Sequence, residues 1–297
     1  MSSSLAQLGA SYRRQGFVSG VPVLNQEELE TTREAFSRLE REFGKEYAQY
    51  SLHNVHLQYG WVMDLATHPK VLELVKAILG PDVILLDSRF ICKYPVAPHS
   101  SPGGGEESDR SDSKPEQLSS TPGVDCGKLN TSPSEQQGTS DLPFVAWHQD
   151  IRYWGVAGGP VLSVWLALDD SFRENGALQV IPGSHTLGIL PHQSSARSGN
   201  MLSTNQEIPE HLLLTDSAQL CPLQAGQMSV HDGLLVHGSE PNTSSRRRCG
   251  FVIRFVPTSA FPVQDPDRPR HFPATVLVSG RDQFKHFPSS TPTAALC

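Results

Sequence analysis

The sequence lacks the features of a membrane, secreted or disulfide-stabilised protein. No apolar run approaches the roughly 18 residues of a membrane-spanning helix, and residues 1–16 have no hydrophobic core of a secretory signal. The five cysteines are odd in number, scattered and without a Cys-x-x-Cys pair, which favours a reducing compartment over a disulfide framework. The last three residues, Ala-Leu-Cys, also differ from the Ser-Lys-Leu peroxisomal signal. We therefore expect a cytoplasmic protein without a membrane partner.

Positive charge is scarce as well. The net charge is −7, the pI is about 5.9, and the arginine run Arg246–Arg248 has no interleaved aromatic residues. These values give no reason to expect a nucleic-acid partner. No internal repeat is visible, and 297 residues suit one domain, since β barrels and sandwiches of about 200–250 residues occur as single units.

One stretch, at about 98–141, differs in composition from the rest. It is rich in Ser, Gly, Pro, Glu and Asp and has only isolated apolar residues. Such a segment cannot bury enough apolar surface to offset its ordering entropy, so we expect a disordered insertion within a single domain that spans 1–297. A lid and a regulatory site are the alternatives to a passenger segment. Deletion of residues 100–140 is expected to leave metal binding intact if the segment is a passenger.

Two helices are predicted before the insertion. Asn25 and Glu28 form a capping-box pattern ahead of an apolar stripe that ends at Phe43. Pro69 begins a second helical pattern that stops at Gly80. Both helices are expected to cover the outside of a β structure.

The remaining sequence predicts strands. Residues 83–93, 144–155, 161–170 and 226–255 are rich in β-branched and aromatic residues, and turn residues such as Asn175-Gly176 and Pro182-Gly183 separate them. Alternation along the last strand places four residues on one face (Arg248, Gly250, Val252 and Arg254) and four on the other (Cys249, Phe251, Ile253 and Phe255). In residues 83–93, the positions Asp87, Arg89, Ile91 and Lys93 likewise share a face.

The step His148-Gln149-Asp150 is the motif that carries most chemical information. On a strand, side chains at positions i and i+2 point to the same face, so one imidazole and one carboxylate meet. A histidine from a distant strand can complete the set. Two histidines and one carboxylate on one side of a metal are the site type of non-haem Fe(II) oxygenases.

Five motifs surround this step in order: WHQD, ENGAL, IPGSH, HGSxPN, and an arginine eleven residues after the last histidine. Together they resemble the phytanoyl-CoA dioxygenase family, from about Tyr12 to Phe287 outside the insertion. The resemblance implies a mainly β fold with flanking helices, namely a double-stranded β-helix (a jelly-roll or cupin-like barrel). It also implies dependence on Fe(II), O₂ and the cosubstrate 2-oxoglutarate, with ascorbate as a supporting reductant.

Carried over to this sequence, the resemblance implies the iron ligands His148, Asp150 and His237. His231 competes with His237, but the family places its ligand in the HGS step. The resemblance also implies that Arg248 binds the distal carboxylate of 2-oxoglutarate, because a planar guanidinium can pair with both carboxylate oxygens. Arg246 and Arg247 are its rivals. Ser239 is expected to donate a hydrogen bond to the same cosubstrate, and Trp165 to form a wall of its pocket.

The expected reaction is hydroxylation of an aliphatic carbon of a small molecule, with release of succinate and CO₂, by a monomer or weak homodimer. Relatives that halogenate have a small residue in place of the carboxylate, so Asp150 favours hydroxylation. Desaturation or cyclisation on the same fold and a non-catalytic jelly roll that binds a ligand or senses a metal remain alternatives. Arg89 has two interpretations: an outward-facing arginine, or a cation that binds an anionic substrate.

Overall fold

The structure is a computed structural model that describes residues 4–95, 142–264 and 270–291. Its contacts divide the chain into two units, Met1–Val96 with Ser140–Cys297, and Ala97–Thr139. The second unit, and with it the predicted insertion at about 98–141, lies outside the described residues. The helices and strands of the described residues all belong to the first unit.

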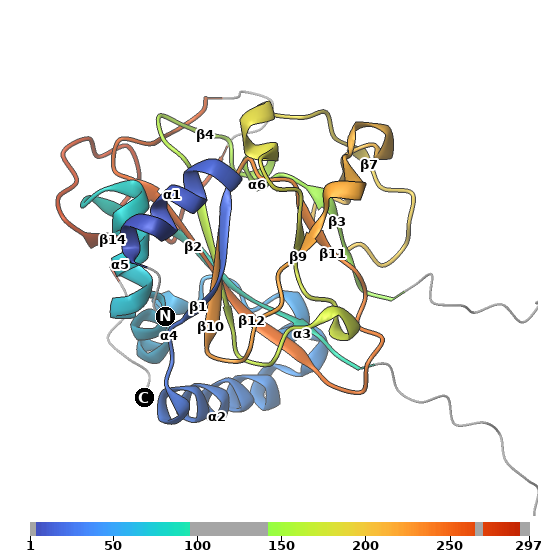
Figure 1. Ribbon diagram of the computed structural model, residues 1–297. Helices are drawn as coiled ribbons and strands as arrows, with labels where there is room; N and C mark the ends of the chain where they lie inside the picture. The colour runs from blue at the N-terminus through green and yellow to red at the C-terminus, as the bar shows by residue number, and fades with distance from the viewer. Residues whose placement is uncertain (1–3, 96–141, 265–269, 292–297) are drawn as a thin grey trace, which may run out of the picture. The chain divides into compact units, whose positions relative to one another are not determined.

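Antiparallel β-sheets dominate this unit (Figure 1). A six-stranded sheet has the order β1-β10-β5-β12-β2-β14, and a four-stranded sheet has the order β3-β11-β6-β9. The strands of the larger sheet are β1 (Phe17–Pro22), β2 (Val83–Lys93), β5 (Leu162–Ala167), β10 (Gln227–Asp232), β12 (Arg248–Pro257) and β14 (Val276–Ser279). Those of the smaller are β3 (Val145–His148), β6 (Gln179–Val180), β9 (Gln219–Leu220) and β11 (His237–Ser239). Two short two-stranded sheets complete the strands: β4 (Val156–Ala157) with β13 (Phe261–Pro262), and β7 (Gln193–Ser194) with β8 (Gln206–Glu207).

The two faces of the larger sheet have different surroundings, as the alternation in the sequence predicts. The outer face of β2 and β12 carries buried apolar side chains that pack on the helices: the Phe90 ring lies 4.9 Å from that of Phe36 and 4.6 Å from that of Phe251. The inner face, with Arg89 and Arg254, lines a cavity to which β3 and β11 of the smaller sheet also contribute. The cavity therefore lies between the two sheets, opposite the helix-covered face.

The α-helices that precede β2 are α1 (Leu5–Gln15), α2 (Gln26–Phe43), α3 (Lys45–Tyr50), α4 (Gly60–Ala66) and α5 (Pro69–Leu79). Both predicted helices are confirmed, and Asn25 and Glu28 form a reciprocal capping box at the start of α2. The expectation of two helices is wrong in number, because α1, α3 and α4 are also present within residues 4–95. Phe43 leaves its predicted stripe: it is 39% exposed and stacks on Tyr47.

The main hydrophobic core of the described residues is formed by the helices and the larger sheet together. The largest apolar cluster joins side chains of α2, α4 and α5 to the outer face of β2, β5, β10 and β12.

None of the helices in the described part of the chain has both the length and the apolarity that a membrane crossing requires.

Candidate metal centre and active-site cavity

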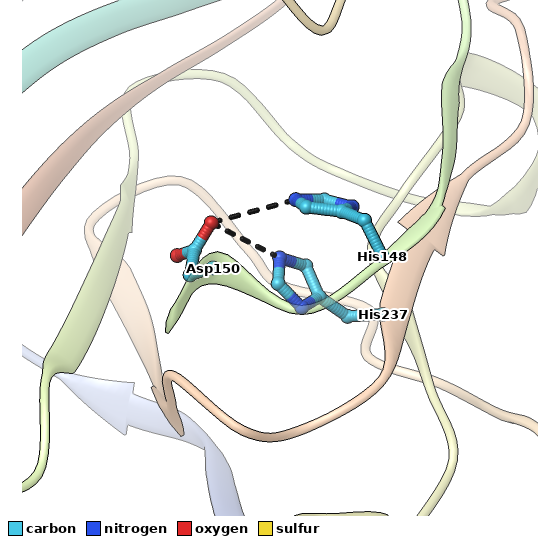
Figure 2. Close-up of side chains that lie close together, drawn as sticks. All are labelled: His148, Asp150 and His237. Atoms are coloured by element: carbon cyan, nitrogen blue, oxygen red, sulfur yellow. Dashed lines mark ion pairs between the residues drawn. The ribbon is translucent and has the colours of Figure 1, made fainter. Parts of the chain in front are cut away.

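The residues of the His-x-Asp motif and His237 meet at one end of the cavity. Strands β3 and β11 pair antiparallel with His148 directly opposite His237, which is why two histidines far apart in sequence become neighbours. One ligand atom from each of His148, Asp150 and His237 lies within 4.8 Å of the others. Asp150 Oδ1 is 3.4 Å from His148 Nε2 and 3.9 Å from His237 Nε2. Figure 2 shows the carboxylate facing both rings.

The backbone fixes the tautomer of both histidines. His148 Nδ1 is 2.9 Å from the carbonyl of Ala146, and His237 Nδ1 is 2.9 Å from the carbonyl of Leu235. A carbonyl only accepts, so each Nδ1 carries the hydrogen and each Nε2 presents a lone pair to the other ligand atoms. Burial, together with the neighbouring histidines, holds the pKa of His237 well below its ordinary value. The imidazole is therefore in its neutral, metal-binding form.

The carboxylate of Asp150 has one oxygen held and one available. Oδ2 accepts hydrogen bonds from Ser163 Oγ at 2.7 Å and from Arg254 Nε at 3.4 Å, whereas Oδ1 faces the histidines. Burial alone raises the pKa of this carboxyl, but the Arg254 charge and the neighbouring histidines outweigh it and hold the pKa well below the usual range. Arg254 also donates to Asp87 Oδ1 at 3.0 Å, and Asp87 in turn contacts His53.

The backbone around the motif differs from the predicted continuous strand. β3 ends at His148, and Asp150 is the first residue of α6 (Asp150–Trp154). Gln149 between them keeps extended dihedral angles (φ −120°, ψ 128°), so the two ligands still face the same way. The buried Gln149 amide donates to the carbonyls of Gly188 and Leu234 and accepts from the Leu190 N–H. These bonds fix the motif to two neighbouring loops.

His231 lies beside the cluster but in a different position. Its Nε2 is 3.8 Å from the outer oxygen of Asp150, and its ring centroid is 4.4 Å from that of His237. Both of its ring nitrogens are buried without a hydrogen-bond partner among the described residues. His231 lines the cavity but is not part of the cluster of possible metal ligands formed by His148, Asp150 and His237. His56 and His192 do form hydrogen bonds.

Two cations lie opposite each other on β2 and β12, and one of them, Arg248, lines the cavity. Arg248 is 3% exposed, its guanidinium lies 4.9 Å from the Trp165 ring centroid, and its Nε has no hydrogen-bond partner. Lys93 is paired with it in register across β2 and β12. The Lys93 ammonium donates to Ser239 Oγ at 2.6 Å and to backbone carbonyls of Gly176, Ser239 and Glu240. The structure thus brings Arg248, Trp165 and Ser239 together with a residue that sequence reasoning did not assign.

The three consecutive arginines have separate surroundings. Arg246 pairs with Glu174, and Arg247 pairs with Asp169 and Glu40, just before β12 begins. Within the described residues, only Arg248 of the three lines the cavity, and neither it nor Lys93 forms an ion pair. Burial lowers the pKa of Arg248 to about 10 and lowers that of Lys93 below its ordinary range. Two buried cations without a carboxylate partner are suited to an anionic ligand.

Two glycines hold this region in place. A Cβ on Gly250 would overlap the Trp165 ring at Cζ2, so only glycine lets the indole lie flat against β12. Gly176 of the ENGAL motif has φ +78°, and its carbonyl accepts from both Lys93 and Arg248. The predicted turn-forming role of Gly176 is confirmed.

The cavity itself has the mixed polar and apolar lining of a small-molecule site. The metal-ligand cluster, Arg248 and Ser239 share its wall with aromatic and aliphatic side chains such as Tyr153, Trp154, Leu178 and Val252.

Comparison with known sequences agrees with the motifs. A sequence model of the family described as phytanoyl-CoA dioxygenase (PhyH) matches residues 127–250, a segment that contains His148, Asp150 and His237. The resemblance to this family is confirmed. The L-proline trans-4-hydroxylase of Streptomyces griseoviridis is 32% identical over 141 residues, which cover 40% of this chain and 52% of that protein. Phytanoyl-CoA dioxygenase domain-containing protein 1 of Bos taurus is 32% identical over 128 residues, 41% of this chain and 42% of that protein. The matched segments therefore span about half, or less, of the length of these two relatives.

Solved structures share the fold over nearly the whole chain. The non-heme monooxygenase ThoJ in its apo form superimposes with a TM-score of 0.68 and 23% identity, covering 97% of this chain and 89% of that one. CytC3 with Fe(II) and alpha-ketoglutarate gives a TM-score of 0.59 and 17% identity, with 96% and 93% coverage. These likenesses establish a mainly β fold of antiparallel sheets with added helices, as predicted.

Proposed function

We propose that this chain is a non-haem Fe(II)- and 2-oxoglutarate-dependent oxygenase on a double-stranded β-helix, and that it hydroxylates an aliphatic carbon of a small organic molecule. One observation carries the proposal: a two-histidine, one-carboxylate cluster lines the same cavity as Arg248, a buried cation without an ion-pair partner among the described residues. The proposal is supported by the similarity to a protein named L-proline trans-4-hydroxylase and to the solved structure of CytC3 with Fe(II) and alpha-ketoglutarate.

The donor set fits Fe(II). His148 Nε2, His237 Nε2 and Asp150 Oδ1 would hold the metal, because these are the atoms that the backbone carbonyls, Ser163 and Arg254 leave available. Imidazole and carboxylate ligands suit this ion, and a three-ligand set leaves further coordination positions for other molecules. Bound Fe(II) and 2-oxoglutarate supply oxygen activation coupled to decarboxylation, with succinate and CO₂ as products.

The cation group fits the distal carboxylate of 2-oxoglutarate. Arg248 Nε is a buried donor without an acceptor, and a carboxylate oxygen would satisfy it. The guanidinium of Arg248 lies over the Trp165 ring. The Lys93 ammonium donates to the Ser239 hydroxyl and so orients it, and the positive charge of Lys93 adds to the attraction for a carboxylate. We include Lys93 in the cosubstrate site on this basis.

The protein's remaining task is to orient the substrate and to exclude water. The aromatic and aliphatic wall accepts an apolar body, and burial of Asp150 and His237 (4% and 5% exposed) limits solvent at the metal position. The Asp150 carboxylate occupies the third protein position at the metal, which favours hydroxylation. Replacement of Asp150 by alanine is expected to abolish it.

The test is succinate formation by the full chain with Fe(II), ascorbate and 2-oxoglutarate, beside a His148→Ala control. Succinate that is absent in the control supports the proposal. Binding of Ni(II) and of 2-oxoglutarate is measured calorimetrically in parallel. If both bind and no succinate forms, the turnover is strictly coupled to a substrate, and the assay is repeated with a substrate panel. If neither binds, the proposal is wrong, and a non-catalytic jelly-roll binding protein takes its place. Desaturation or cyclisation would appear as a product lacking the added oxygen.

A further inference from the structure

Once the metal and cosubstrate positions are assigned, one cation on the cavity wall has no role. Arg89 is on the inner face of β2, between Asp87 and Ile91, and its side chain lines the cavity. Its guanidinium lies 4.1 Å from the ring centroid of Tyr50, the last residue of α3. Of its two interpretations in the sequence, the outward-facing one is wrong.

Arg89 has no anion among the described residues. Neither an ion pair nor a side-chain hydrogen bond involves it there, and its Nε is buried without an acceptor. Arg254, which lies on the neighbouring strand β12, contacts both Asp87 and Asp150. A buried donor that lacks an acceptor is costly, so a ligand oxygen at this place gains the bond that the protein leaves unmade.

A second donor nearby has the same property. The indole Nε1 of Trp154 is also buried without an acceptor, and Trp154 lines the same cavity. Tyr50, Tyr153 and Val252 add aromatic and apolar surface to the same wall. This environment suits a ligand that has an apolar body and one group rich in acceptor oxygens.

The position of Arg89 separates it from the cosubstrate group. Lys93 and Arg89 are four residues apart on β2, which is about 13 Å along a strand. The two carboxyl carbons of 2-oxoglutarate are joined by four C–C bonds and lie about 5 Å apart when extended. A cosubstrate held at Lys93 and Arg248 therefore leaves Arg89 for a different ligand.

We propose that Arg89, stacked on Tyr50, binds the carboxylate of the prime substrate, which is a small carboxylic acid with an apolar body. This inference rests on the proposed oxygenase function and names its substrate class. The planar guanidinium pairs with the carboxylate through its in-plane N–H groups, while Tyr50 covers one of its faces. Recognition of this kind orients the apolar body along the cavity toward the metal cluster.

The experiment compares acids with their neutral amides on the Ni(II)- and 2-oxoglutarate-loaded full chain. The probes are hexanoate with hexanamide, 3-phenylpropanoate with 3-phenylpropanamide, and L-proline with L-prolinamide, and binding is measured by ligand-observed NMR titration. Because a charge-assisted bond contributes about 1.5–3 kcal/mol, we expect at least one acid to bind about ten- to hundredfold more tightly than its amide. Arg89→Met removes this preference, and Arg89→Lys retains part of it.

Two controls accompany the variants. Arg173→Met removes the same charge from an exposed position outside the cavity and is expected to leave the preference unchanged. The affinity for 2-oxoglutarate is expected to stay the same in Arg89→Met, which also shows that the variant is folded.

Three results overturn the inference. These are the absence of an acid preference for every probe pair in the unaltered protein, an acid preference that persists in Arg89→Met, and a loss of 2-oxoglutarate binding in that variant. The third assigns Arg89 to the cosubstrate. Failure of the unaltered protein to bind Ni(II) or 2-oxoglutarate contradicts the oxygenase function itself, so the two failures are distinguishable.

Discussion

Replacement of Arg254 by methionine tests whether one cation holds the metal-binding carboxylate in place. Its side chain is 13% exposed and bridges Asp87 at 3.0 Å and Asp150 at 3.4 Å, two carboxylates that are 3% and 6% exposed. Removal of one partner from a buried ion pair costs about 3–5 kcal/mol, against at most about 1 kcal/mol for a surface pair. Since a domain's total stability is about 5–15 kcal/mol, we expect Arg254→Met to fold with much reduced stability.

The assay is urea unfolding of the metal-free protein, followed by Ni(II) titration. A loss of about 4 kcal/mol lowers the urea midpoint by more than about 1 M at a slope of about 3 kcal/mol/M. Without Arg254, Asp150 Oδ2 keeps only the Ser163 hydroxyl, so Ni(II) affinity is expected to fall about ten- to hundredfold. Arg254→Lys is expected to be intermediate, because one ammonium cannot match a fork that contacts two carboxylates.

A double variant tests whether the cost of Arg254→Met comes from the two carboxylates that Arg254 contacts. Asp87→Asn removes one of the two charges that Arg254 neutralises, so Arg254→Met is expected to cost about 2 kcal/mol less in that background. Arg247→Met, just before β12, is the matched control: Arg247 also bridges two carboxylates, but its side chain is 22% exposed. If Arg254→Met costs no more than Arg247→Met, and its cost adds to that of Asp87→Asn, the argument is refuted.

Three further predictions concern the cofactor region. Gly250→Ala displaces the Trp165 indole and is expected to cost about 1–3 kcal/mol in thermal unfolding and to weaken 2-oxoglutarate binding; unchanged values would contradict the packing argument. Arg248→Met is expected to weaken 2-oxoglutarate binding about ten- to hundredfold in calorimetry, whereas Arg246→Met leaves it unchanged. Burial and the neighbouring histidines depress the pKa of His237 below 6.5, so only the unfolded chain takes up this proton as the pH falls below that value. The metal-free protein is expected to lose stability there, and His237→Asn to show a flatter stability–pH profile.

The parts of the site that were predicted from sequence are those fixed by short-range pattern. Through the family resemblance, the HQD step, the HGS step and the eleven-residue spacing point to His148, Asp150, His237 and Arg248, and the structure brings all four to one cavity. Period-two alternation gives the correct inner face of β12, because a shift by one residue would turn its apolar face away from the buried outer side.

The missed residues depend on pairing between distant strands. Lys93 becomes a neighbour of Arg248 only through the register of β2 against β12, and no local signal specifies that register. Ser163 likewise reaches Asp150 from β5. The helices α1 and α3 were missed because they bury few residues (Gly9 and Tyr12 in α1, Ala48 in α3), so the apolar period is weak.

The run Arg246–Arg248 shows why residue type alone does not assign a role. Arg246 precedes the strand and pairs with Glu174, whereas Arg247 is turned toward α2 and is neutralised by Glu40 and Asp169. Arg248, the first residue of β12, points inward, where Trp165 covers its guanidinium and the described residues provide no carboxylate. A cation in that setting is suited to an anion that arrives from outside the chain, and Arg89 meets the same three conditions on β2: an inward position, an aromatic cover and a missing acceptor. The physical argument that assigns the cosubstrate carboxylate to Arg248 therefore assigns a second carboxylate to Arg89.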